Sequence, residues 1–269
     1  RDNQQAYKNE TRSMDGKPGK NYWQNHARYN INITAMPPDR NIKGSETISY
    51  INNSPDTILN PSIKLFINIH KPGAARDRSV DADYLTSGVH IDEITVNGEA
   101  MDTSDASNVF TNYRLQLSKP LMPHDSLQLG FKWNYDISVQ SNREGMIDST
   151  TYYLAYFYPR IAVFDDYNGW DRMQFMDSHE FYSDFNDYVV TVNVPQNYIV
   201  VGTGTLQQPE NLLQPEILKR YSQSFNSDAT INIVTAQDIA AKKATTQNDI
   251  NSWQFIANNI PDMAFGLSD

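Results

Sequence analysis

Apolar and polar residues alternate along two stretches near the start of the chain, residues 28–34 and 44–52. In the first stretch the apolar side chains are those of Tyr29, Ile31 and Ile33. A period of two places successive side chains on opposite faces of a strand, one face toward a core and one toward solvent. Residues 37–39 (Pro-Pro-Asp) are a turn signal between the stretches. The pattern therefore predicts two strands that open a β-domain.

The pattern changes at Ser62–His70, where a nearly continuous apolar run predicts a segment buried between layers. Polar and charged residues at 71–88 predict a long loop with a short helix near Asp81–Leu85. A hairpin follows at 89–101, because an Asn97-Gly98 pair between apolar stretches is the strongest short-range hairpin signal. Two further strands are expected at Tyr113–Leu117 and Ser126–Val139.

One stretch has helical periodicity, Gln214–Phe225. Pro215 lies in its first turn, where a missing backbone N–H costs little, and Leu218, Tyr221 and Phe225 form an apolar stripe. After it, residues 229–240 and 252–268 are expected to be strands, joined by a polar linker at 242–251. About ten strands with regular turn signals and one short helix predict an all-β architecture of packed sheets.

The central stretch, residues 152–205, is unusually rich in Tyr, Phe and Trp. Aromatic side chains bury large areas but accept only particular packing geometries. We therefore interpret this stretch as the inner wall of a β-domain that meets a substrate, a partner or another domain.

The composition excludes several function classes. The 269 residues include 39% hydrophobic and 12% aromatic residues, enough for a sizeable core, and the net charge is −10. An acidic chain is a poor ligand for nucleic acid or for an anionic membrane surface. The chain contains no cysteine, which removes disulfides, thiolate metal sites and cysteine nucleophiles. No apolar run approaches the ~18 residues that a membrane-spanning helix needs.

No motif for catalysis or metal binding is convincing. There is no Gly-x-Ser-x-Gly elbow, and none of the five histidines has a second histidine three to five residues away. The segment 179–183 (His-Glu-Phe-Tyr-Ser) begins like a zincin motif but lacks the second imidazole and lies in strand-like surroundings. Asp165 and Asp166 with Glu180 could suggest a glycosidase, but adjacent residues of a strand point to opposite faces. We expect one aspartate to cap the turn into Asn168-Gly169-Trp170, and we expect no catalytic residue and no bound metal in this chain.

Two segments of the central stretch resemble a known family. They read YFYPRIAVFDDYNGWD at 156–171 and EFYSDFNDYVVTVNVPQNYIVVGTGTL at 180–206, and they are similar to the N-terminal domain of M1-family (gluzincin) zinc aminopeptidases of a bacterial branch. NREGMID at 142–148, NLLQPEILKRYSQS at 211–224 and WQFIANNIPDMAFGLSD at 253–269 agree with this resemblance, which covers the chain from about Trp23.

The resemblance implies a saddle-like, mostly antiparallel multi-sheet β-sandwich at residues 23–269, preceded by a flexible lead-in at 1–22. It implies that the zinc site lies in a following catalytic domain, whose GxMEN and HExxH motifs are absent here. This chain would then be non-catalytic and would form one wall of the active-site cleft. Its partners would be that catalytic domain and the peptide N-terminus. The start at Arg1 rather than Met suggests a trimmed piece, and together with the branch and the missing cysteines it suggests a periplasmic or exported protein.

The resemblance also assigns roles to individual residues. Such domains carry a Gln or Glu just before the Tyr-Pro-Arg motif that binds the substrate's α-amino group, and here Tyr156 takes that place. A tyrosine offers a hydroxyl and a π face but no charge, or it packs as an ordinary aromatic. The candidate substrate-binding residues are Tyr156, Tyr158 and Arg160. The structural motif, expected to provide buried ion pairs and turn anchors, comprises Pro159, Asp165, Asp166, Gly169, Trp170 and Glu180.

A stand-alone β-sandwich that binds glycans or cell-surface partners is the alternative. It predicts a polar tail, whereas 260–267 is apolar, as if leading into another domain. Exposed isolated rings would favour glycans, and a broad exposed apolar patch around 152–170 would mark a domain interface.

Overall fold

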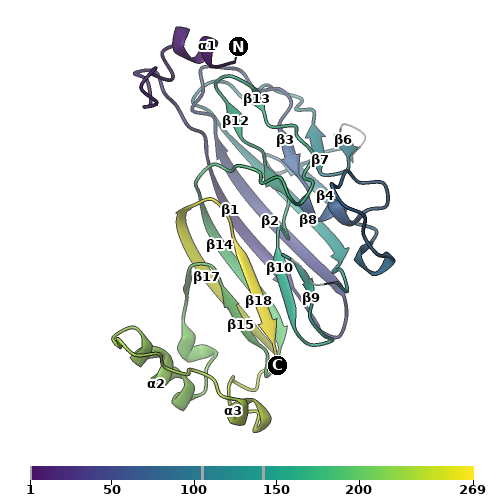
Figure 1. The fold of residues 1–269 in the computed structure, drawn as a ribbon, viewed down its shortest axis with the longest axis vertical. Helices are drawn as coiled ribbons and strands as arrows, with labels where there is room; N and C mark the ends of the chain where they lie inside the picture. The colour runs from purple at the N-terminus through teal and green to yellow at the C-terminus, as the bar shows by residue number, and fades with distance from the viewer. Residues whose placement is uncertain (1, 104–105, 141–142) are drawn as a thin grey trace.

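The computed structural model describes residues 2–103, 106–140 and 143–269. Its largest element is a mostly antiparallel sheet of eight strands that runs along the long axis (Figure 1). In spatial order these strands are β16 (Thr205–Leu206), β17 (Ile250–Ile260), β14 (Asn186–Pro195), β1 (His26–Thr34), β2 (Asn41–Ile51), β8 (Ser126–Asp136), β4 (His90–Val96) and β5 (Glu99–Ala100). The pair β1–β14 is parallel, and the other pairs in this sheet are antiparallel.

Two four-stranded sheets and a small hairpin complete the β-structure. The first sheet is β15 (Ile199–Gly202), β18 (Ala264–Ser268), β10 (Tyr152–Ala155) and β9 (Gly145–Met146). The second is β11 (Arg160–Ile161), β3 (Ser62–Lys64), β7 (Asn112–Leu115) and β6 (Ala106–Val109). The hairpin pairs β12 (Phe164–Asp165) with β13 (Gly169–Trp170).

The helices are short and lie at the ends of the molecule (Figure 1). They are α1 (Asp2–Lys8), α2 (Pro215–Ser224) and α3 (Ala236–Ala240), with 3₁₀ turns η1 (Phe66–His70), η2 (Ala82–Tyr84) and η4 (Pro209–Asn211). No described helix has the length and apolar character needed to cross a lipid bilayer.

The core lies between the inner face of the large sheet and the two smaller sheets. One continuous cluster of buried side chains draws from all three. Two hydrogen bonds cross the layers inside this cluster: the Trp133 indole N–H donates to the Phe157 carbonyl at 3.0 Å, and the Ile161 N–H donates to the Tyr29 hydroxyl at 3.2 Å. Because a buried polar group without a partner is costly, these bonds fix how the layers stack.

Most predictions about individual elements are confirmed. Tyr29, Ile31 and Ile33 are buried and alternate with exposed neighbours along β1. Ser62–His70 is buried throughout, as the short strand β3 followed by η1. The Asn97-Gly98 hairpin joins β4 to β5, and α2 lies within the predicted helix. The mostly antiparallel, multi-sheet all-β class is confirmed as well.

Three expectations need correction. The described residues form three short α-helices rather than one, and 229–240 is not a strand. Within it, Thr235 and Asp238 form a reciprocal capping box that starts α3. A helix of five residues is too short to show an apolar period. The apolar residues of 260–267 also have an internal explanation, because β18 is an inner strand whose Phe265 and Leu267 are buried.

The first residues of the chain follow a defined path. After α1, Thr11 and Arg12 contact the carboxylate of Asp166, more than 150 positions away. Residue 1 lies outside the described residues, as does Asn142 of the motif at 142–148. The flexibility predicted for 1–22 and the division at residue 22 stay predictions.

An acidic side chain is buried on the inner face of the large sheet. Glu46 on β2 is 4% exposed, and neither carboxyl oxygen has a hydrogen-bond partner among the described residues. Burial raises the pKa of Glu46 well above its ordinary value, and the charge of Arg160 only partly opposes this. The protonated form is therefore the one that fits the folded state.

Glu46 makes stability depend on pH. The raised pKa of Glu46 contributes stability that is fully present below its pKa in the unfolded chain, about 4.3. This contribution is lost as pH rises toward the pKa in the folded chain, and the free energy of unfolding then falls by up to about 1.4 kcal/mol per pH unit. We expect Glu46→Gln to remove this part of the slope in urea unfolding curves from about pH 4.5 upward. Glu99→Gln, at an exposed position, is the control. An unchanged slope in Glu46→Gln would show that Glu46 ionises freely in the fold.

Candidate functional site

Tyr156 lies immediately after β10, in a backbone conformation that tyrosine rarely adopts. Its φ is 61°, in the left-handed region that costs a bulky residue about 1–3 kcal/mol. The ring is held edge-on by three phenylalanines, with centroid distances of 5.6, 5.3 and 5.4 Å to Phe66, Phe175 and Phe181. These contacts keep the strained residue in place, and we call Tyr156 and the three rings the aromatic cluster.

A charged pair lies at the edge of the aromatic cluster. The Arg143 guanidinium donates to the Tyr156 hydroxyl at 3.2 Å and pairs with the Glu180 carboxylate at 2.5 Å. The Arg143 side chain is 39% exposed and that of Glu180 is 62% exposed. The hydrogen bond from Arg143 lowers the pKa of Glu180. Arg143 therefore links Tyr156 to a solvent-facing carboxylate. The sequence motif predicts a structural role for Glu180 and gives no sign of this contact.

Behind the cluster, Arg160 is buried at 3% exposure. Its guanidinium donates to the Tyr158 hydroxyl at 2.7 Å and to the Ser183 hydroxyl at 2.8 Å, and it pairs with the Asp262 carboxylate. It also lies 5.2–5.4 Å from the ring centroids of Phe66 and Phe181, within the range of a cation–π interaction.

Tyr158 is buried like Arg160, at 2% exposure. Its hydroxyl lies 3.2 Å from both the Tyr188 hydroxyl and the Asp262 carboxylate, either of which can accept its one proton. Burial raises the pKa of Tyr158 well above its ordinary value. Pro159 between them is buried too. Because Tyr158 and Arg160 are buried, their more direct role is to hold the aromatic cluster in position. Direct contact of either residue with substrate stays a prediction.

Asp165 and Asp166 do not point apart, contrary to the expectation for neighbours on a strand. The strand β12 ends at Asp165 and Asp166 begins the turn, so both carboxylates reach the Arg12 guanidinium at 3.0 Å. The Asp165 carboxylate also accepts the backbone N–H of Asp166, the first residue of the turn, and a capping role for either carboxylate further into Asn168-Gly169-Trp170 stays a prediction. Gly169 adopts a φ of 66°, which glycine allows without strain, and Trp170 beside it is buried.

These two carboxyl groups titrate differently. Burial raises the pKa of Asp165 to about 6. Burial also acts to raise the pKa of Asp166, but hydrogen bonds with Asp165, Arg12 and Thr11 outweigh it and lower that pKa to about 2. Arg12 therefore binds a pair in which Asp166 carries the more persistent charge.

The segment 179–183 is irregular rather than strand-like. Across the described ranges, no three His, Cys, Asp or Glu side chains come together in a way that could hold a metal ion. One buried pair was missed: the His70 imidazole contacts the Glu144 carboxylate. These residues lie 74 positions apart, so no sequence spacing signals their contact.

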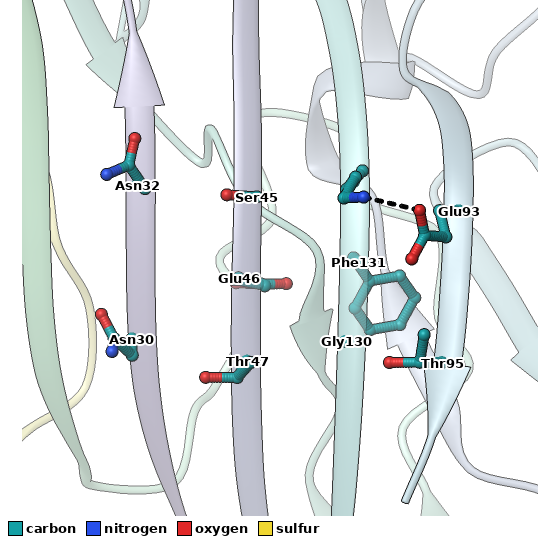
Figure 2. Close-up of a pocket in the computed structure, with 10 residues that line it drawn as sticks. Asn30, Asn32, Ser45, Glu46, Thr47, Glu93, Thr95, Gly130 and Phe131 are labelled. Atoms are coloured by element: carbon teal, nitrogen blue, oxygen red, sulfur yellow. Dashed lines mark hydrogen bonds and ion pairs between the residues drawn. The ribbon is translucent and has the colours of Figure 1, made fainter. Parts of the chain in front are cut away.

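The outer face of the large sheet carries a shallow polar hollow over Gly130 (Figure 2). It is lined mostly by amide and hydroxyl side chains such as Asn30, Thr47 and Thr95, with Lys132 paired to Glu93 at 2.7 Å. Such side chains are ordinary on the solvated face of an antiparallel sheet. The aromatic residue drawn there, Phe131, is buried, so the hollow offers no stacking platform.

No model of a known protein family matches the sequence, and no curated protein matches it. Solved structures do match. A mutant form of the M1 zinc metallopeptidase from Deinococcus radiodurans has a TM-score of 0.50 and 11% sequence identity, and the match covers 94% of this chain and 44% of that chain. Another structure of the M1 zinc metallopeptidase from that organism has a TM-score of 0.49 and 11% sequence identity, and that match covers 93% of this chain and 43% of the other. The mutant form shows the fold that the sequence resemblance implied, and this chain spans less than half of the length of the solved structures.

Removing the Arg160 charge should destabilise the chain. Arg160→Met keeps much of the side-chain volume but leaves the Tyr158 and Ser183 hydroxyls and the Asp262 carboxylate without their donor. We expect the free energy of unfolding to fall by about 2–4 kcal/mol, measured by urea unfolding. The matched control is Arg28→Met, whose side chain is 72% exposed and whose loss should change stability by less than about 0.5 kcal/mol. Equal effects would mean that the buried network adds nothing.

Proposed function

We propose that this chain is the N-terminal domain of an M1-like zinc metallopeptidase. In this role it forms one wall of the active-site cleft and contacts the N-terminus of the peptide. The observation that carries the proposal is the motif at 156–171 and 180–206 on a fold that matches 44% of an M1 metallopeptidase. A periplasmic or exported location belongs to the same proposal.

The reaction would take place in the cleft between this chain and a partner catalytic domain. Zinc bound there would polarise the scissile carbonyl and activate water. The described residues of this chain do not fit a zinc site, because they gather no set of ligands. The contribution of this chain is to hold the peptide in position.

The Glu180 carboxylate supplies the charge that Tyr156 lacks. A peptide α-ammonium is a cation, and a charge-assisted bond to a carboxylate is about twice as strong as a neutral one. Glu180 is exposed, and the contact through which it connects to Tyr156 is Arg143. We infer that an incoming ammonium shares Glu180 with Arg143 while the Tyr156 hydroxyl and ring form the side of the amine pocket.

The proposal is tested with the complete gene product and with the 269-residue chain, in parallel. The complete protein should hydrolyse alanine p-nitroanilide and should lose this activity with a chelator, whereas the 269-residue chain should show no hydrolysis. A complete protein that is inactive on a panel of amino-acid p-nitroanilides, with and without added zinc, would contradict the proposal and would favour a binding module.

Glu180 is tested by its effect on peptides with free and blocked N-termini. In the complete protein, Glu180→Gln should raise KM for a free peptide about tenfold and should leave an N-acetylated peptide unaffected, because only the free amine carries charge. Glu216→Gln on the exposed face of α2 is the matched control. A similar loss for both peptides would show that Glu180 supports the fold rather than the amine.

A further inference from the structure

A second pocket is formed where three distant segments converge, residues 22–24, 163–167 and 182–184, with Arg12 at its edge. Its volume is about 240 Å³. Most of the aromatic side chains in its wall are tyrosine or tryptophan, which carry a polar O–H or N–H group. Trp23 stacks on Phe164 at a centroid distance of 5.8 Å. The aromatic members of the wall are Tyr22, Trp23, Phe164, Tyr167 and Tyr182.

Acidic groups outnumber basic ones in this wall. Asp165, Asp166 and Asp184 face the pocket, and Arg12 is the basic side chain among its lining residues. The Arg12 guanidinium pairs with the first two carboxylates at 3.0 Å and lies 5.0 Å from the centroid of the Tyr167 ring. Carboxylate pairing and a ring face thus already hold one planar cation here.

Asp184 has no comparable partner. Among the residues that the structure describes it forms no ion pair, and its hydrogen bond is a 3.4 Å contact from the Gln24 side-chain amide. Burial, with a smaller contribution from the charge of Asp165, raises the pKa of Asp184 to about 6, and the hydrogen bond from Gln24 and the charge of the nearby His26 only partly oppose this. The side chain is therefore a partly buried acid beside aromatic rings, and among the described residues no basic group forms an ion pair with it.

We propose that this pocket binds the guanidinium or primary ammonium group of a basic side chain, which pairs with Asp184 against the aromatic wall. Carboxylate oxygens need N–H donors, which favours these groups over a quaternary ammonium. The volume suits one such side chain rather than a folded partner. The inference is independent of the proposed peptidase role, since it rests only on this pocket.

The test is a titration of the ¹⁵N-labelled 269-residue chain with n-butylguanidinium chloride, followed by the Trp23 indole N–H signal, which a Trp23→Phe variant assigns. We expect a saturable shift with a Kd of roughly 1–10 mM. The neutral n-butylurea and tetramethylammonium should cause no saturable shift, because the first lacks charge and the second lacks N–H donors.

Two variants and a control connect binding to the pocket. Asp184→Asn should weaken binding about tenfold, and Tyr182→Leu, at a half-exposed ring, by about threefold. Asp228→Asn, at an exposed aspartate, should bind as the unaltered chain does. Circular dichroism melting confirms that each variant is folded, and Tyr182→Leu serves alone if Asp184→Asn does not fold.

Three results would overturn the proposal. These are an unsaturated shift at every concentration of butylguanidinium, equal binding of butylurea or tetramethylammonium, and undiminished binding in the folded variants.

Discussion

The buried guanidinium of Arg160 is the interaction on which this structure most depends. It connects the end of the Tyr-Pro-Arg segment, the ring of Phe66 in η1, Ser183 in an irregular loop and Asp262 between β17 and β18. A cation this deeply buried is costly unless it has hydrogen-bond acceptors and a counter-charge. The two terminal nitrogens of Arg160 have such partners, while its Nε has none among the described residues. Each of these distant segments therefore has to reach one point in the core, and the positions of the smaller sheets follow from that.

This constraint explains how an irregular loop acquires a defined shape. Most residues of 180–184 have different partners: Glu180 pairs with Arg143, Phe181 stacks on Phe66, Ser183 accepts from Arg160, and Asp184 lines the second pocket. The loop has no sheet ladder, so side-chain contacts determine its path. The same contacts hold the strained Tyr156 at the surface, and strain of this kind concentrates where function requires a particular side-chain direction.

Sequence reasoning reached the fold but little of the site. The alternation along β1, the Asn-Gly turn after β4 and the stripe of α2 are local signals, and the aromatic motif at 156–171 indicated the architecture that the solved structures support. The contact of Arg143 with Glu180, and of Arg12 with Asp166, joins residues 37 and 154 positions apart. Such pairings depend on tertiary packing, which no periodicity records. The expectation that Asp165 and Asp166 point to opposite faces was wrong for a local reason. The strand β12 ends at Asp165, so Asp166 lies in the turn and is free of the strand alternation.

The most direct test of the account is the zinc content of two purified proteins, the complete gene product and the 269-residue chain, measured by mass spectrometry after dialysis. We expect about one zinc ion per molecule in the complete protein and none in the 269-residue chain, because the proposed metal site belongs to the partner domain. Stoichiometric zinc in the 269-residue chain, or its absence from the complete protein, would contradict the proposal that this chain is the metal-free wall of a peptidase cleft.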